Sequence, residues 1–174
     1  IFEKFTKALV AETLKLKMGD PSDRENFLGA LISSDHRKKV QSYVELARSE
    51  GAKIWCGGKS PELASPWSGG YFFEPTVMTG VRPESKVQQE EIFGPVVTVT
   101  PFSTDEEAIL LANSTAYGLS VSIWTNDESR ILKMQKGLEV GTMWVNCWMV
   151  RDLRVPFGGV KASGIGREGG EDSL

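Results

Sequence analysis

Cysteine and histidine are both scarce in this sequence of 174 residues, which contains two cysteines and one histidine. Cys56 and Cys147 are too few for a disulfide framework or a thiolate metal site. A single histidine excludes an internal histidine cluster, so we expect no metal centre. His36 lies in a polar segment typical of a helix start, which favours an exposed helix-capping role over catalysis. Sparse cysteine usage fits a reducing compartment, and we expect a cytoplasmic protein.

Long apolar runs and an excess of basic charge are absent as well. No run approaches the roughly 20 apolar residues that cross a bilayer, so we expect no membrane association. The chain carries 20 basic and 23 acidic residues, for a net charge of -3, and we expect no nucleic-acid partner. It begins at Ile1 without an initiator methionine or a leader, which we interpret as the mark of a piece excised from a longer protein.

The sequence predicts a single α/β domain over residues 1–174, truncated at both ends. At this length roughly two thirds of the unfolded chain's surface can be buried, which permits a sizeable core. Segments with helical periodicity alternate with short runs rich in β-branched residues, a pattern typical of a layered α/β/α domain with a largely parallel sheet. The expected helices are 2–16, 34–49 and those beginning near Ser103 and Asn126; the expected strands are 53–56, 71–78, 96–100, 119–125 and 141–146.

One candidate ligand-binding motif spans residues 89–95, which read QEEIFGP just before an expected strand. Glu90 and Glu91 are adjacent in extended chain and point to opposite faces, so they cannot share a proton. Phe93 lies two residues after Glu91 and shares its face. A single carboxylate can accept two hydroxyl hydrogen bonds from a ribose diol, and the ring can pack on a flat group. On its own, such a Glu-x-Phe pair is more typical of a surface residue followed by a core residue.

A second dense motif covers residues 141–170 and contains a strand end, an arginine-rich loop and a Pro-Phe-Gly-Gly turn. Phe157 in that turn is either core packing or a pocket wall, and spacing alone favours the core. The glycines of residues 164–169 satisfy G-x-G-x-x-G, but no strand directly precedes them, so we reject a dinucleotide fingerprint.

Two arginines lie in the loop of this motif. Arg151 can hold a substrate carboxylate through a charge-assisted pair. Asp152 can instead pair with Arg151 or Arg154 at the surface, and without further context this simpler interpretation is favoured. The sequence leaves the role of Arg154 open.

Together the strings EEIFGP and PFGGVKASGIGRE resemble the C-terminal part of the catalytic domain of NAD(P)-dependent aldehyde dehydrogenases. The resemblance implies that Glu91 binds the nicotinamide ribose, that Phe93 lies against the nicotinamide ring, and that Phe157 lines the aldehyde channel. It also implies NAD as cofactor, with NADP possible, a small aldehyde substrate, and a parent that forms homodimers or homotetramers.

The composite string from Asn146 to Gly159 is similar to the 2-aminomuconic and 2-hydroxymuconic semialdehyde dehydrogenases, whose substrates carry a carboxylate. That similarity implies substrate binding by Arg151. It favours an enzyme that oxidises a carboxylated semialdehyde to the acid. A general aliphatic aldehyde dehydrogenase, a non-catalytic module of the same scaffold and a reductase of activated acyl groups remain alternatives.

The resemblance further implies that a cysteine thiolate attacks the aldehyde, that hydride passes to the nicotinamide, and that base-activated water hydrolyses the thioester. Neither Cys56 nor Cys147 matches that nucleophile, which belongs to a glycine-flanked loop expected upstream of Ile1. The general-base glutamate is expected further upstream. We therefore assign no catalytic residue within these 174 residues and expect them to be inactive alone.

Overall fold

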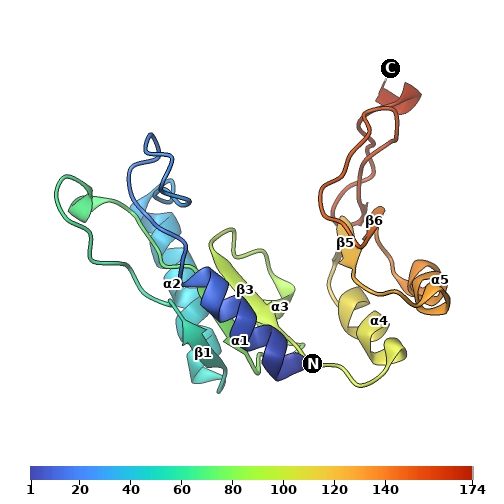
Figure 1. The fold of residues 1–174 in the computed structure, drawn as a ribbon, viewed down its shortest axis with the longest axis horizontal. Coiled ribbons are helices and arrows are strands. Elements are labelled where there is room, and N and C mark those ends of the chain that lie inside the picture. Colours follow the sequence, from blue (N-terminus) through green and yellow to red (C-terminus); the bar gives the residue numbers. More distant parts are fainter. Residues whose placement is uncertain (174) are drawn as a thin grey trace. The chain divides into compact units, whose positions relative to one another are not determined.

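A computed structural model describes residues 1–173 of the chain and divides it into two compact units (Figure 1). Unit 1 is Ile1–Pro101 and unit 2 is Phe102–Leu174. The expectation of one domain over the whole chain stays a prediction. Within the described residues, no helix is long and apolar enough to cross a membrane.

Unit 1 builds a three-stranded sheet in the order β1-β2-β3 beside its helices (Figure 1). The central strand β2 pairs antiparallel with β1 and parallel with β3. The elements of this unit are α1 (Phe2–Thr13), α2 (Ser34–Ser49), β1 (Lys53–Cys56), η1 (Trp67–Gly69), β2 (Thr76–Thr79), α3 (Lys86–Gln89) and β3 (Val96–Val99).

The core of unit 1 lies between α2 and the sheet. Val40, Val44 and Ala47 recur at helical spacing on α2 and are at most 1% exposed. They pack with Phe73 and with Met78 of β2 in one hydrophobic cluster. The apolar stripe that predicts α2 is therefore the stripe that is buried, as expected for an amphipathic helix.

Unit 2 contains two small sheets and two helices. β5 pairs in parallel with β6, and β4 pairs antiparallel with β7. Its elements are α4 (Asp105–Asn113), β4 (Tyr117–Gly118), β5 (Ser120–Ile123), α5 (Glu128–Gly137), β6 (Thr142–Val145), β7 (Val160–Lys161) and η2 (Glu171–Ser173).

The helix starts of unit 2 follow local capping chemistry. The hydroxyl of Thr104 accepts a hydrogen bond from the backbone N–H of Glu107, whose carboxylate accepts one from the N–H of Ser103. This exchange resembles a capping box, one residue beyond the expected helix start at Ser103. The helix expected to begin near Asn126 is α5, and Asp127 caps it by accepting from the N–H of Arg130 at 3.1 Å.

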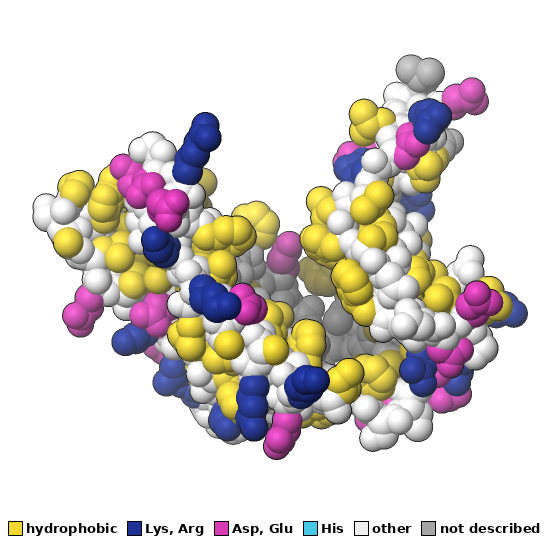
Figure 2. Space-filling model, viewed as in Figure 1, with side chains coloured by type: hydrophobic (Ala, Val, Ile, Leu, Met, Phe, Trp, Pro, Cys, Tyr) yellow, Lys and Arg dark blue, Asp and Glu magenta, His cyan; other side chains and the backbone are white. Residues whose placement is uncertain are grey.

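The predicted α/β class is confirmed. The pairs β2–β3 and β5–β6 are parallel, whereas β1–β2 and β4–β7 are antiparallel. Short elements that carry too little periodicity for detection, namely α3, β4 and β7, were not predicted. Large apolar side chains remain exposed on both units, including Phe27, Ile32, Trp124 and Leu153, and Figure 2 shows many hydrophobic side chains at the surface.

Candidate functional site

The loop before β3 presents the first two predicted site residues. Ile92 packs against the core cluster, which leaves Glu91 and Phe93 on either side of it exposed. Phe93 is 72% exposed and has a φ of 58°, in the left-handed region that non-glycine residues rarely adopt. This loop therefore displays a carboxylate and an aromatic ring to solvent, and the ring is not core packing.

Three side chains of α2 hold this loop. The Nε2 atom of His36 lies 2.6 Å from the carbonyl oxygen of Phe93. Lys39 donates to the Glu91 carbonyl at 3.2 Å, and the Tyr43 hydroxyl donates to the Glu90 carboxylate at 2.5 Å. These contacts engage the loop backbone and Glu90.

The Glu91 carboxylate forms no hydrogen bond or ion pair with any residue that the structure describes. An exposed carboxylate with free lone pairs can accept hydrogen bonds from both hydroxyls of a diol. The neighbouring Phe93 ring offers an open face to a flat group. The loop therefore exposes a hydrogen-bond acceptor and an aromatic ring, a combination that can contact a sugar linked to a flat ring.

The expected capping role of His36 is wrong. The hydroxyl of Ser33 caps α2 by accepting the backbone N–H of His36 at 3.1 Å. The imidazole is partly buried and bonds to Phe93, 57 residues away in the sequence. Sequence reasoning missed this contact, although the spacing of His36, Lys39 and Tyr43 places them on one face of a helix.

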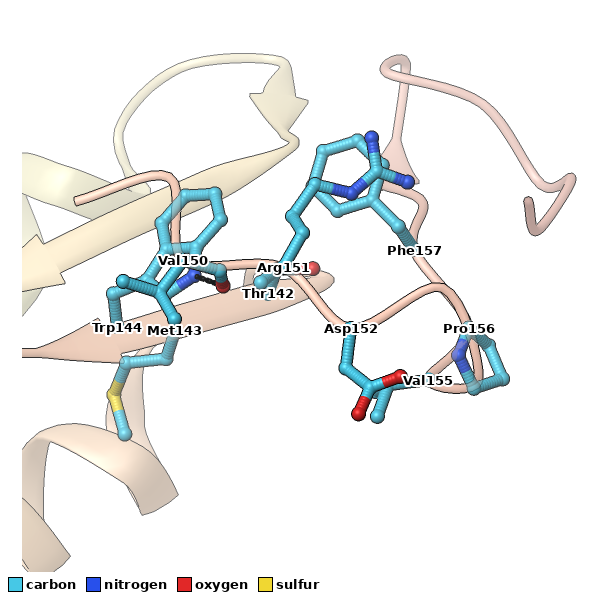
Figure 3. Close-up of a pocket in the computed structure, with 9 residues that line it drawn as sticks. All are labelled: Thr142, Met143, Trp144, Val150, Arg151, Asp152, Val155, Pro156 and Phe157. Carbon is cyan, nitrogen blue, oxygen red and sulfur yellow. Dashed lines mark hydrogen bonds between the residues drawn. The ribbon is translucent and has the colours of Figure 1, made fainter. Parts of the chain in front are cut away.

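In unit 2, β6 and the loop after it enclose a pocket of about 480 Å³ (Figure 3). Both substrate-site residues predicted for this unit, Arg151 and Phe157, line it. Trp144 of β6 is 7% exposed and donates its indole N–H to the Val150 carbonyl at 2.8 Å. The remaining lining residues are Thr142, Met143, Asp152, Val155 and Pro156.

Arg151 and Phe157 are in direct contact. The guanidinium carbon lies 4.3 Å from the centre of the Phe157 ring, close enough for a cation–π interaction. The same guanidinium forms a longer ion pair with Glu168, at 3.6 Å. Glu168 is held there by two backbone hydrogen bonds with Phe157, each of 2.7 Å. Phe157 is therefore a pocket wall, although spacing alone favoured the core.

Arg154, whose role the sequence leaves open, pairs with Asp152. Its guanidinium donates to both oxygens of that carboxylate, with Nε at 2.9 and 3.1 Å. These bonds, together with the backbone N–H of Arg154, hold the pKa of Asp152 below its usual value. The Asp152 carboxylate is thus engaged by Arg154, and the guanidinium of Arg151 has no partner closer than Glu168 within the described part of unit 2.

The two cysteines belong neither to the loop of Glu91 and Phe93 nor to the pocket of Arg151 and Phe157. The Cys56 thiol lies 3.8 Å from the Pro75 carbonyl, beside the sheet of unit 1. Cys147 is partly buried, and its carbonyl accepts a hydrogen bond from Ser122. Neither lines the pocket of Arg151 and Phe157. Among the described residues, no group of three His, Cys, Asp or Glu side chains is placed to hold a metal ion.

Comparison with known proteins places these residues in a family. The model of the aldehyde dehydrogenase family matches residues 1–174. The 2-aminomuconic semialdehyde dehydrogenase of Danio rerio is 49% identical over 99% of this chain and 36% of its own length. The 2-hydroxymuconic semialdehyde dehydrogenase of Pseudomonas putida is 47% identical over the whole chain and 36% of its own length.

Solved structures agree with these matches. A betaine aldehyde dehydrogenase from Staphylococcus aureus in complex with NAD+ has 42% identity and a TM-score of 0.91. The match covers 98% of this chain and 34% of that one. The chain thus spans about a third of the length of the relatives it matches. Both the sequence motifs and the fold show that the chain belongs to the aldehyde dehydrogenase family.

Proposed function

We propose that the protein containing this chain oxidises a carboxylated semialdehyde to the acid, with NAD or NADP as hydride acceptor. Relatives named as 2-aminomuconic and 2-hydroxymuconic semialdehyde dehydrogenases are 46–49% identical to it. Because those relatives are about three times as long, the activity is proposed for the longer protein. We expect that protein to work as a homodimer or homotetramer.

In this proposal the loop before β3 binds the coenzyme. The free Glu91 carboxylate accepts hydrogen bonds from the hydroxyls of the nicotinamide ribose, and the exposed Phe93 ring lies against the nicotinamide. NAD(P), when bound, accepts hydride from the substrate. Support comes from the exposure of both groups and from the relative solved with NAD+.

Arg151 anchors the substrate carboxylate, and Phe157 forms one wall of the aldehyde channel. The observation that carries this assignment is the ion pair between Asp152 and Arg154. Because Arg154 occupies Asp152, Arg151 keeps its N–H donors for a bidentate pair with an incoming carboxylate. Its place over the Phe157 ring, in a pocket of about 480 Å³, supports the same role.

The experiment is a substrate panel on the full-length protein and its Arg151→Ala and Arg154→Ala variants. Losing Arg151 is expected to raise KM for a carboxylated semialdehyde by about 10- to 100-fold, the loss of a charge-assisted bond. KM for a neutral aldehyde of equal length should change far less. Arg154→Ala frees the Asp152 carboxylate to compete for Arg151, so it should raise the ratio of the two KM values by less than Arg151→Ala does.

Equal KM changes for both aldehydes in Arg151→Ala would remove the anchor role. That result would favour a general aldehyde dehydrogenase in which Arg151 pairs only with Glu168. The ion pair between these two side chains, at 3.6 Å, supports this alternative.

The 174 residues alone are expected to be inactive, because neither Cys56 nor Cys147 matches the family's nucleophile. The purified chain, supplied with NAD+ and a semialdehyde, should form no NADH above a protein-free control. Measurable NADH formation would show that a thiol within this chain supports the reaction.

A further inference from the structure

We propose that His36 is a positioning residue for Phe93 and fixes the coenzyme-contacting loop through the Phe93 carbonyl. This inference rests on the proposed function, because the consequence for binding follows only if Glu91 and Phe93 contact the coenzyme. The distance of 2.6 Å between Nε2 and the carbonyl oxygen is its starting point.

Phe93 needs an external restraint. Its φ of 58° is unfavourable for a residue with a side chain, and its ring is 72% exposed, so the core does not hold it. Gly94 follows directly, and a Cβ built on it would lie 2.6 Å from a methyl carbon of Val40. The loop therefore lies tightly against α2, and a side chain of α2 is the group available to fix its backbone.

His36 supplies that restraint in two ways. A carbonyl oxygen can only accept, so the Nε2 atom must carry a proton, in the neutral Nε2–H tautomer or in the imidazolium. The imidazole also meets the Phe93 ring edge-on, with centroids 5.9 Å apart and an interplanar angle of 83°. One side chain thus contacts both the backbone and the ring of Phe93.

The other contacts from the same helix face leave the binding groups free. Lys39 bonds to the carbonyl of Glu91, and Tyr43 bonds to the side chain of Glu90. Neither contact engages the Glu91 carboxylate. Together with His36, these residues at i, i+3 and i+7 of α2 fix the loop while leaving its carboxylate and ring open to a ligand.

The test measures binding of NAD+ to the full-length protein by titration calorimetry. His36→Ala is expected to raise the Kd for NAD+ by about three- to ten-fold, the effect of one lost hydrogen bond. His36→Phe keeps a ring but no donor and should behave similarly. His36→Gln keeps an N–H donor and should stay within about two-fold of the wild type. Gln41→Ala, on α2 and bonded to Glu45, is the control expected to leave Kd unchanged.

Amide hydrogen exchange without coenzyme gives a readout independent of binding. The amides of residues 91–94 should exchange faster in His36→Ala and His36→Phe but not in His36→Gln, while α2 keeps its protection. If His36→Ala fails to fold, the comparison of the Phe and Gln variants decides. Wild-type Kd and loop exchange in His36→Phe would overturn the proposal.

Two further variants separate this inference from the proposed function. Glu91→Gln and Phe93→Ala should weaken NAD+ binding if the loop contacts the coenzyme. If neither does, the proposed coenzyme site fails, and the positioning role for coenzyme binding fails with it. If both do and His36→Phe binds NAD+ as the wild type does, only the positioning role of His36 is wrong.

Discussion

The guanidinium of Arg151 lies over the ring of Phe157, with 4.3 Å between the guanidinium carbon and the ring centre. The Phe157 ring is in turn stacked with Trp144, at 6.3 Å between centroids and an angle of 29°. Since Trp144 is buried in β6, this series of contacts connects a charged group in a loop to a strand of the sheet. The position of Arg151 is therefore tied to the fold of unit 2.

Replacing Phe157 by leucine should weaken the binding of a carboxylated semialdehyde. Leucine preserves an apolar wall but removes the cation–π contact, which is expected to raise KM by about two- to five-fold. Phe157→Tyr keeps the aromatic ring and is the matched control. Steady-state kinetics on the full-length protein with carboxylated and neutral aldehydes would measure the effect. Identical KM values in the Leu and Tyr variants would show that the aromatic ring at position 157 does not help to position Arg151.

Replacing Glu168 by glutamine should strengthen binding of the same substrate. Glu168 pairs with Arg151 at 3.6 Å and is 76% exposed, so its carboxylate competes weakly with an incoming one. Removing the charge is expected to lower KM for the carboxylated aldehyde, relative to KM for the neutral one, by about two- to five-fold. This factor corresponds to the free energy of an exposed ion pair. Glu171→Gln serves as control. A raised ratio would mean that Glu168 supports Arg151 and does not compete for it.

Replacing Gly141 by alanine should destabilise unit 2. A Cβ at this position would lie 1.7 Å from the carbonyl oxygen of Gly158, the residue that follows Phe157. The backbone of that turn must therefore move. Overpacking of this kind costs about 1–3 kcal/mol and should lower the midpoint of thermal unfolding. Gly166→Ala is the control, because no atom lies within 4 Å of its Cβ position. Equal midpoints for the two variants would show that the turn adapts without strain.

The contact between Asp152 and Arg154 should contribute stability that depends on pH. The side-chain and backbone hydrogen bonds from Arg154 lower the pKa of Asp152 below its usual value in the folded chain. A carboxyl whose pKa is depressed by folding stabilises the protein above its unfolded pKa, and that contribution disappears as pH falls through the folded value. Wild type should therefore exceed Asp152→Asn in thermal stability at neutral pH. The two should converge under acid, and a difference that persists there would assign the effect to another cause.

Local patterns in the sequence predicted much of the fold. The bounds of α2 and β1 were predicted to the residue. The apolar stripe of α2 lies within the helix itself, and β1 is a short segment bounded by Gly51 and by Gly57. The start of α4 was predicted near Ser103, and the N-cap is the next residue, Thr104. Errors arose where neighbours compete for one role, as with Asn126 and Asp127, because either side chain can cap a helix.

The sequence predicted which residues belong to the candidate site, but it did not predict which of them form ion pairs with one another. The sequence placed Arg151, Asp152 and Arg154 in one loop, yet it left open which arginine binds the carboxylate. The contacts in the folded chain decide this choice. Arg154 reaches Asp152 with both its N–H and its guanidinium, whereas Arg151 lies over Phe157.

By itself, the sequence determined the types of the longer elements, the α/β class and the family, because these depend on periodicity and on short strings of residues. Only the tertiary structure decided that His36 reaches Phe93 across 57 residues and that Glu168 lies beside Arg151. The physical reason is that these contacts depend on the path of the chain between them. No local pattern specifies that path, whereas packing of the core and pairing of the strands do.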